Sequence, residues 1–268
     1  MIEKLSPEAM LVAMVKIQNS LNTKSYNTEW IEKGKSGEFD YEMAAAAEII
    51  EFCDSLPFSW WSKAKEDRRN CITELVDAWH FIMSQALIDK NGNAEDACEY
   101  VISWYESAQE SMSAERMLNV PQVSVKRRAK NLMMELGLNA ENNECKIVVM
   151  DNYISEFFCL CEAYSVSLEL LFARYLGKAT LNKFRQDNGY KTGQYRKIWT
   201  MWRKNMAEGE KLLAPAEDNY YLSLFIDDSV EKRKPVDTSE IYTWLSATYA
   251  LTEPWPKEEG INTGVGTT

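Results

Sequence analysis

Residues that break helices are scarce in this chain, and this scarcity constrains the fold more than any other feature of the sequence. Only 11 of the 268 residues are Gly and 7 are Pro. Ala, Leu, Glu, Lys and Met, which favour the helical backbone, are plentiful. Apolar residues recur at intervals of three and four along the long segments between the breaks. The sequence therefore predicts an all-α protein folded as a multi-helix bundle.

Start and stop signals divide the chain into helices and loops. Ser6 and Pro7 begin a helix that we expect to end near Asn22. Gly34 and Gly37 indicate a loop, and Pro57 separates two helices, because the residue before a proline disfavours the helical backbone. The other expected helices span Tyr41–Ser55, Asp67–Asp89, Ala94–Leu118, Ser124–Gly137, a single long segment from about Cys145 to Leu176, and a last one from Asp237 or Thr238 to about Leu251.

The length of the chain is enough to bury one substantial core, or a core and a smaller subdomain. We expect one all-α domain over residues 1–260, within which residues 94–145 form a helical insertion or subdomain. Residues 261–268 are mostly Gly and Thr, and we expect them to form a disordered tail.

Charge and cysteine usage argue against several classes of protein. The net charge of −11 opposes a nonspecific nucleic-acid surface, which needs clustered Lys and Arg. Six Cys without a Cys-x-x-Cys pair, and a single His, argue against a structural zinc site. No signal-peptide pattern and no apolar run of membrane-spanning length occurs. We expect a soluble, intracellular, cytoplasmic protein that binds neither nucleic acid nor membranes.

Two pairs of acidic residues stand out within apolar helical segments. Glu48 and Glu51 lie three positions apart, as do Glu74 and Asp77, so each pair shares one helix face. Four carboxylates converging between two antiparallel helices would repel one another unless a cation neutralised them. Mg²⁺ is the natural partner, since it binds oxygen ligands and bridges substrate phosphates. Either pair alone is more often a solvated helix face, but two pairs on adjacent helices favour a metal site.

The segment between residues 176 and 202 differs from the rest of this acidic chain, because it is basic, aromatic and punctuated by glycine. A purely structural role for the protein would not explain the composition of this segment. Gly189 and Gly193 fit turn positions. The basic run Lys126-Arg127-Arg128, by contrast, is interpreted as a solvated face or as a contact with acidic neighbours, without a function.

Five motifs then follow one another in order. They are Gln18-x-x-Leu21-Asn22; Glu48-x-x-Glu51-x-x-Asp54-Ser55; Glu74-Leu75-Val76-Asp77-x-Trp79-His80-Phe81; a long segment from Lys178 through Asn182, Arg185, Asn188-Gly189-Tyr190-Lys191, Gly193, Tyr195 and Lys197 to Trp199; and Glu217-Asp218-Asn219. Together they resemble the dimeric deoxyuridine triphosphatases (dUTPases) of the all-α nucleotide pyrophosphohydrolase superfamily. The resemblance covers the framework of an active site, whereas residues 84–170 and those after 220 carry little signature.

The resemblance implies a role for each matched residue. The implied metal ligands are Glu48, Glu51, Glu74 and Asp77, and one of the first pair, Glu48 or Glu51, also orients the attacking water. The implied phosphate-binding residues are Lys178, Arg185, Tyr190, Lys191, Tyr195 and Lys197. The implied base and sugar contacts are Gln18, Asn22, Trp61, His80, Phe81, Asn182 and Asn219. These residue types suit that chemistry, because Lys and Arg neutralise phosphate oxygens, and Asn and Gln pair with pyrimidine edges.

The implied activity is Mg²⁺-dependent hydrolysis of dUTP, and of dUDP, to dUMP, which keeps uracil out of DNA and supplies dUMP. Two or more Mg²⁺ ions in the substrate complex and a homodimer are implied as well. A lone His such as His80 is more often structural, but the resemblance favours a ligand contact.

The segment Phe58-Ser59-Trp60-Trp61-Ser62-Lys63 departs from the family pattern, since serines stand where lysines are expected. This departure leaves open a dCTP and dUTP pyrophosphatase, as in related phage enzymes. A catalytically inactive helical module that binds nucleotides is the other alternative.

Overall fold

A computed structural model of the chain underlies the description of the fold. The residues described are 5–57, 65–118, 123–141, 152–199, 202–203, 211–212, 215–232, 234 and 236–252. The expected tail at 261–268 and the segment from Phe58 to Lys63, with Trp61, lie outside them.

Helices account for nearly all of the described secondary structure, as the sequence predicts. They are α1 (Pro7–Tyr26), α2 (Glu29–Lys35), α3 (Tyr41–Asp54), α4 (Arg68–Asp89), α5 (Ala94–Met117), α6 (Val125–Glu141), α7 (Tyr153–Ala163), α8 (Leu168–Asp187), α9 (Asp218–Glu231) and α10 (Thr238–Leu251). Polar caps begin many of them: the side chains of Ser6, Asp67, Asn93 and Asp237 accept hydrogen bonds from backbone N–H groups of the first turn. The all-α fold is therefore confirmed.

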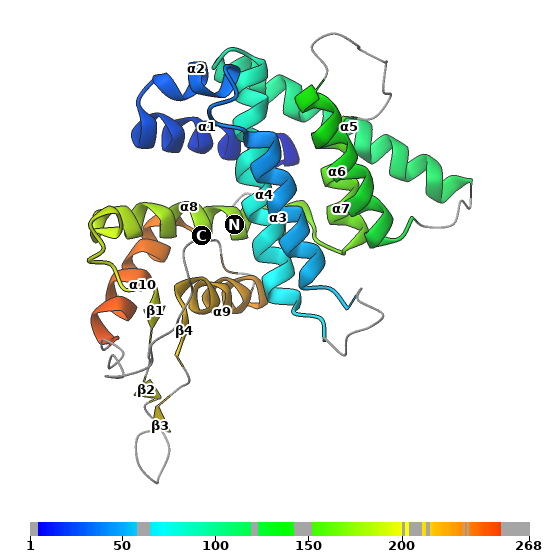
Figure 1. Cartoon of the computed structure of the whole chain (residues 1–268). Coiled ribbons are helices and arrows are strands. Elements are labelled where there is room, and N and C mark those ends of the chain that lie inside the picture. Colours follow the sequence, from blue (N-terminus) through cyan, green and yellow to red (C-terminus); the bar gives the residue numbers. More distant parts are fainter. Residues whose placement is uncertain are drawn as a thin grey trace, which may run out of the picture.

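Helices α3 and α4 pack side by side at the centre of the molecule (Figure 1). The contacts between them run in opposite order along the two segments, with Ser55 near Asn70, Phe52 near Cys71 and Tyr41 near Phe81. The pair is thus antiparallel, as expected. Helix α4 buries residues on most of its circumference, because neighbouring helices cover it on several sides.

The other helices surround this pair. Helix α1 packs on α4, α5 and α8; α6 packs on α3 and α7; and α9 and α10 pack on α8. The hydrophobic core is continuous across them and contains large buried side chains such as Trp30, Trp79, Phe157 and Tyr175. In the basic run, Lys126 and Arg127 are exposed. Arg128 is buried and pairs with Glu115 and Glu156.

The prediction of one long helix up to Leu176 was wrong. The described part of that segment forms two helices, α7 and α8, because the chain turns between Tyr164 and Ser167. Ser165 adopts a left-handed backbone with φ of 58°. The Ser167 hydroxyl then caps α8 by accepting from the Leu170 N–H. Helix α8 also continues to Asp187, so it carries the first part of the basic segment.

The first loop also differs from the prediction. Helix α1 continues past Asn22 to Tyr26, and Gly34 lies in the last turn of the short helix α2 instead of in a loop. A Cβ atom at Gly34 would lie 2.5 Å from Ile88 Cδ1 on α4. This glycine therefore permits close packing of two helices. At Gly37 and Gly92 the backbone has positive φ, as expected of turns.

Two short antiparallel ribbons extend from the region of α8 to α10 (Figure 1). They pair β1 (Ile198–Trp199) with β4 (Ala216–Glu217) and β2 (Trp202–Arg203) with β3 (Lys211–Leu212). Among the described residues, no helix is both long and apolar enough to cross a membrane.

Candidate active site

A single cavity of about 750 Å³ brings together residues from four of the five motifs. Helices α1, α3, α4 and α8 surround it. It is lined by Gln18, Leu21, Asn22, Ser25, Tyr26, Phe39, Asp40, Tyr41, Ala44, Glu48, Asp77, His80, Phe81, Ser84, Lys178, Asn182, Arg185, Gln186 and Tyr190. Helical spacing explains the gathering, because residues 18 and 22, 80 and 84, and 178, 182 and 185 each share a face of their helix.

Three of the four predicted metal ligands converge between α3 and α4. Oxygen atoms of Glu48, Glu74 and Asp77 all lie within 4.8 Å of one another, and we term these three residues the carboxylate cluster. Glu74 is buried and the other two are half-buried. Glu51 is exposed and lies outside the cluster, although its charge raises the pKa of both Glu48 and Glu74.

The cluster is electrostatically unfavourable by itself. Burial, followed by the charges of Asp77, Glu74 and Glu51, raises the pKa of Glu48 to about 8. Burial and Asp77 also raise the pKa of Glu74, and the two glutamates share a hydrogen bond. Protonation relieves the repulsion in the absence of a cation. A cluster of three convergent carboxylates, in which Glu48 and Glu74 resist ionisation, fits a hard dication, which would supply the missing positive charge.

A neutral hydrogen-bonded network occupies another part of the cavity. It consists of Gln18 and Asn22 on α1 and His80 and Ser84 on α4, and we term it the neutral network. The Gln18 amide donates to Asn22 Oδ1 at 2.9 Å and to Ser84 Oγ at 3.1 Å. Asn22 Nδ2 donates to the same hydroxyl at 2.9 Å. The Ser84 hydroxyl donates to the carbonyl of His80.

His80 is held as a neutral imidazole with one nitrogen unpaired. Burial, followed by the charge of Lys178, lowers the pKa of His80 to about 3. Its Nδ1 lies 2.6 Å from Gln18 Oε1, so this nitrogen carries the proton. His80 Nε2 is then an acceptor, and it is buried without a partner among the described residues. A buried acceptor of this kind is available to a donor on a ligand or on a water molecule.

An aromatic wall completes this part of the cavity, and the sequence interpretation missed most of it. Tyr26, Phe39 and Tyr41 line the cavity beside Phe81. The four rings form a continuous row. The distance between ring centroids is 5.0 Å for Tyr26 and Phe39, 6.3 Å for Phe39 and Tyr41, and 6.4 Å for Tyr41 and Phe81. Ser84 was missed too. Its position four residues after His80 could have revealed it.

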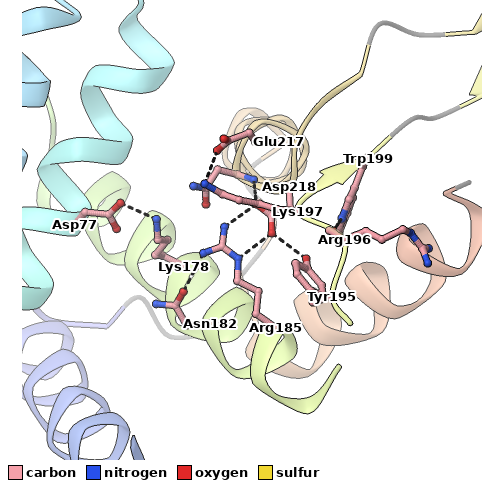
Figure 2. Close-up of polar contacts among 11 residues, drawn as sticks. Asp77, Lys178, Asn182, Arg185, Tyr195, Arg196, Lys197, Trp199, Glu217 and Asp218 are labelled. Atoms are coloured by element: carbon pink, nitrogen blue, oxygen red, sulfur yellow. Dashed lines mark hydrogen bonds and ion pairs between the residues drawn. The ribbon is translucent and has the colours of Figure 1, made fainter. Parts of the chain in front are cut away.

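The basic segment contributes Lys178, Asn182, Arg185 and Tyr190 to the cavity wall. Lys178 Nζ lies 2.6 Å from Asp77 Oδ2 of the carboxylate cluster. Arg185 is paired on two nitrogens with Asp218, from Nε at 2.8 Å and from Nη2 at 2.6 Å (Figure 2). Only Nη1 is directed elsewhere, 3.5 Å from Asn182 Oδ1.

Asp218, the middle residue of the fifth motif, joins three segments. Its side chain is fully buried. Besides Arg185 of α8, it accepts a hydrogen bond from the Tyr195 hydroxyl at 2.8 Å, and its own backbone N–H donates to the Lys197 carbonyl. The predicted phosphate residue Tyr195 therefore contacts Asp218 and does not line the cavity (Figure 2). No pattern around residue 218 indicated that role.

The remaining predicted residues lie outside the main cavity. Lys191 and Lys197 are exposed, and Lys197 pairs with Glu217 at 3.2 Å. Asn219 lines a small separate cavity of about 20 Å³ together with Lys178. Gly189 and Gly193 have φ of 82° and 72°, which agrees with their interpretation as turn residues.

Comparison with known proteins connects this geometry to a family. A search of curated proteins finds no match. The sequence profile described as dUTPase matches residues 10–190, which is more than half of the chain. The matched range contains the carboxylate cluster, the neutral network and the helix that carries Lys178 and Arg185. The chain belongs to the dUTPase family, and it is a nucleotide pyrophosphohydrolase of the dUTP diphosphatase type.

Proposed function

We propose that this protein hydrolyses dUTP, and also dUDP, to dUMP with Mg²⁺ held by the carboxylate cluster. One observation carries the proposal: a single cavity is lined by Glu48 and Asp77 of the cluster, by the neutral network and by Lys178. Its volume of about 750 Å³ lies within the range of small-molecule sites, roughly 300–1,000 Å³.

The neutral network is our candidate for the base site. His80 Nε2 needs a donor, and the ring N3–H of uracil is one. Cytosine has an unprotonated N3 acceptor at that position, which would face the His80 lone pair. The network therefore favours uracil over cytosine. Phe81 and the aromatic wall would contact the faces of the base or the sugar, and Asn182 would bond a hydroxyl or phosphate oxygen.

The carboxylate cluster is our candidate for the metal site. Glu48, Glu74 and Asp77 would hold Mg²⁺, and a second ion in the substrate complex would need phosphate oxygens as additional ligands. Bound Mg²⁺ supplies charge neutralisation and lowers the pKa of water. Glu51 is accessible and outside the cluster, so it is the carboxylate left to orient the attacking water.

The phosphate end of the cavity carries Lys178, Arg185 and Tyr190, which would bind the phosphate oxygens. Tyr195 would act through Asp218, and Asn219 would act beside Lys178. Lys191 and Lys197 are exposed on the segment that follows and would reach a phosphate only if that segment moved. Placing charges around phosphate oxygens is the main requirement of phosphoryl transfer.

We further propose that the protein is a homodimer. Met43 and Ile50, which lie seven positions apart on α3 and therefore on one helix face, are 64% and 53% exposed. Met134 on the adjacent α6 is 63% exposed. Exposed apolar side chains on two helices that pack on each other suit a protein contact. Light scattering at micromolar concentration should give twice the chain mass, and a monomer would contradict this assignment.

The test of the activity is release of pyrophosphate and phosphate from dUTP, dUDP, dCTP, dTTP and UTP, with Mg²⁺ and with EDTA. We expect turnover of dUTP and dUDP with Mg²⁺, none with EDTA, and rejection of UTP. Preference for dCTP would favour the dCTP and dUTP pyrophosphatase and would point to residues 58–63. Nucleotide binding without turnover of any substrate would favour the inactive module.

A further inference from the structure

Lys178 forms an ion pair with a carboxylate of the proposed metal site. Its ammonium on α8 contacts Asp77 Oδ2 on α4 at 2.6 Å, and the two side chains are 11% and 18% exposed. Asp77 is a member of the carboxylate cluster, whose oxygens lie within 4.8 Å of one another. Figure 2 shows this contact apart from the group around Asp218. The ammonium is thus a positive charge at the edge of the cluster.

A dication and this ammonium oppose each other at Asp77. Both draw on the same carboxylate, and like charges a few Å apart in a half-buried site repel strongly. Arg185, the neighbouring cation on α8, is already neutralised by Asp218. Lys178 is therefore the cavity-lining cation whose ion-pair partner is a cluster carboxylate.

Lys178 has alternative acceptors for its ammonium group within reach of the two cavities that it lines. It lines the main cavity and also the small cavity that contains Asn219. The Asn219 Oδ1 atom is buried and has no hydrogen-bond partner among the described residues. An ammonium that leaves Asp77 could donate to this oxygen, or to phosphate oxygens in the main cavity.

We propose that Lys178 is a built-in counter-ion of the metal site: it pairs with Asp77 while the carboxylate cluster is free of metal, and it is released toward Asn219 and the substrate phosphates when a dication binds. Metal binding would then make a phosphate-binding cation available. This inference rests on the proposed function in one respect, namely that the carboxylate cluster binds a dication.

The proposal is tested by the affinity of the full chain for Mn²⁺ in the absence of nucleotide. The concentration of free Mn²⁺ is measured by electron paramagnetic resonance. Lys178→Met and Lys178→Gln remove the charge with two different shapes. We expect both to bind Mn²⁺ at least about tenfold more tightly than the unmodified chain, because a competing cation is gone. The matched control is Lys183→Met on the same helix, where the lysine is half exposed and pairs with Asp187. Its affinity should not change.

Equal or weaker Mn²⁺ binding by both Lys178 variants would overturn the proposal while leaving the metal site intact. Absence of Mn²⁺ binding in every form, including the unmodified chain, would overturn the metal-dependent function as well. Should both variants fail to fold, ¹³C-dimethylation of lysines in the unmodified chain gives a second measurement. We expect the resonance of one buried lysine to shift with Mg²⁺, and constant resonances would contradict release of Lys178.

Discussion

The neutral network and two members of the carboxylate cluster, Glu48 and Asp77, line one cavity, but the two groups are stabilised in opposite ways. In the network, Gln18, Asn22 and Ser84 satisfy one another through neutral hydrogen bonds, and the acceptor on His80 remains for a ligand. At the charged end, Lys178 is paired with Asp77, and Arg185 is paired with Asp218. On our proposals, the neutral end would accept a base without rearrangement, whereas the charged end would exchange the ion pair of Lys178 when metal and phosphates bind.

Asp77→Asn should break the charged end with the largest effect on activity. It keeps the shape of the side chain but removes a cluster carboxylate and the partner of Lys178. We expect dUTP turnover to fall by roughly 100-fold or more, since even changes to residues that support a metal ligand cost about 10–100-fold. Helicity by circular dichroism should stay the same. The control is Asp228→Asn, at an exposed surface pair with Lys232, and equal activity of the two variants would argue against the cluster.

Asp218→Asn tests the Arg185–Asp218 ion pair separately from the Lys178–Asp77 pair. It leaves Arg185, whose side chain is 11% exposed, without an anion, and breaking a buried pair costs about 3 kcal/mol. We expect that loss in urea unfolding, together with a raised KM for dUTP. Asp187→Asn removes an exposed partner of Lys183 and should cost less than about 1 kcal/mol. Similar losses for both variants would mean that Asp218 is not an anchor.

The carboxylate cluster should make the stability of the metal-free protein depend on pH. The pKa of Glu48 rises from 4.5 to about 8 on folding, so the folded protein binds more protons than the unfolded chain across that interval. The free energy of unfolding in EDTA should therefore fall as the pH rises, by roughly 2 kcal/mol after allowance for partial exposure. Saturating Mg²⁺, or Glu48→Gln, should flatten this slope. An unchanged slope in Glu48→Gln would contradict the assignment.

The smallest effect is expected at the neutral network, where His80 should not titrate between pH 5 and pH 8. This behaviour would contrast with that of Glu48 in the carboxylate cluster. His80 is the only histidine in the chain, so its ring resonances in NMR need no assignment by mutation. With a pKa lowered to about 3, they should stay constant from pH 8 to pH 5. The stabilisation from neutral His80 should be lost only as the pH falls below its ordinary value of 6.5. A midpoint near 6.5 would show that the network is open to water.

Local signals in the sequence were enough to predict most helices. Ser6, Asp67, Asn93 and Asp237 begin helices within one residue of the expected positions, because a cap acts through its own first turn. The turn at Ser165 was missed, since a non-glycine residue with positive φ has no strong sequence signature. Gly34 was wrongly assigned to a loop, because the need for glycine there comes from close packing against Ile88, which is distant in the sequence.

The site was predictable to the extent that helix faces determine it. Spacing brought Glu48, Glu74 and Asp77 together, and the motifs indicated Gln18, Asn22 and His80. The partners of the cations were not predictable. That Arg185 meets Asp218, 33 positions later, depends on how α9 packs on α8. The aromatic wall depends likewise on where the α1 to α3 connection lies.

The position of Asp218 also sets a lower limit on the length of an active fragment. The match to the dUTPase family ends at residue 190, so a fragment designed from that match would retain every carboxylate of the cluster. It would nevertheless lack Asp218 and Tyr195, so Arg185 would lose the carboxylate that holds it, and α8 would lose the cover of α9 and α10. We therefore expect a minimal working enzyme to extend through α9.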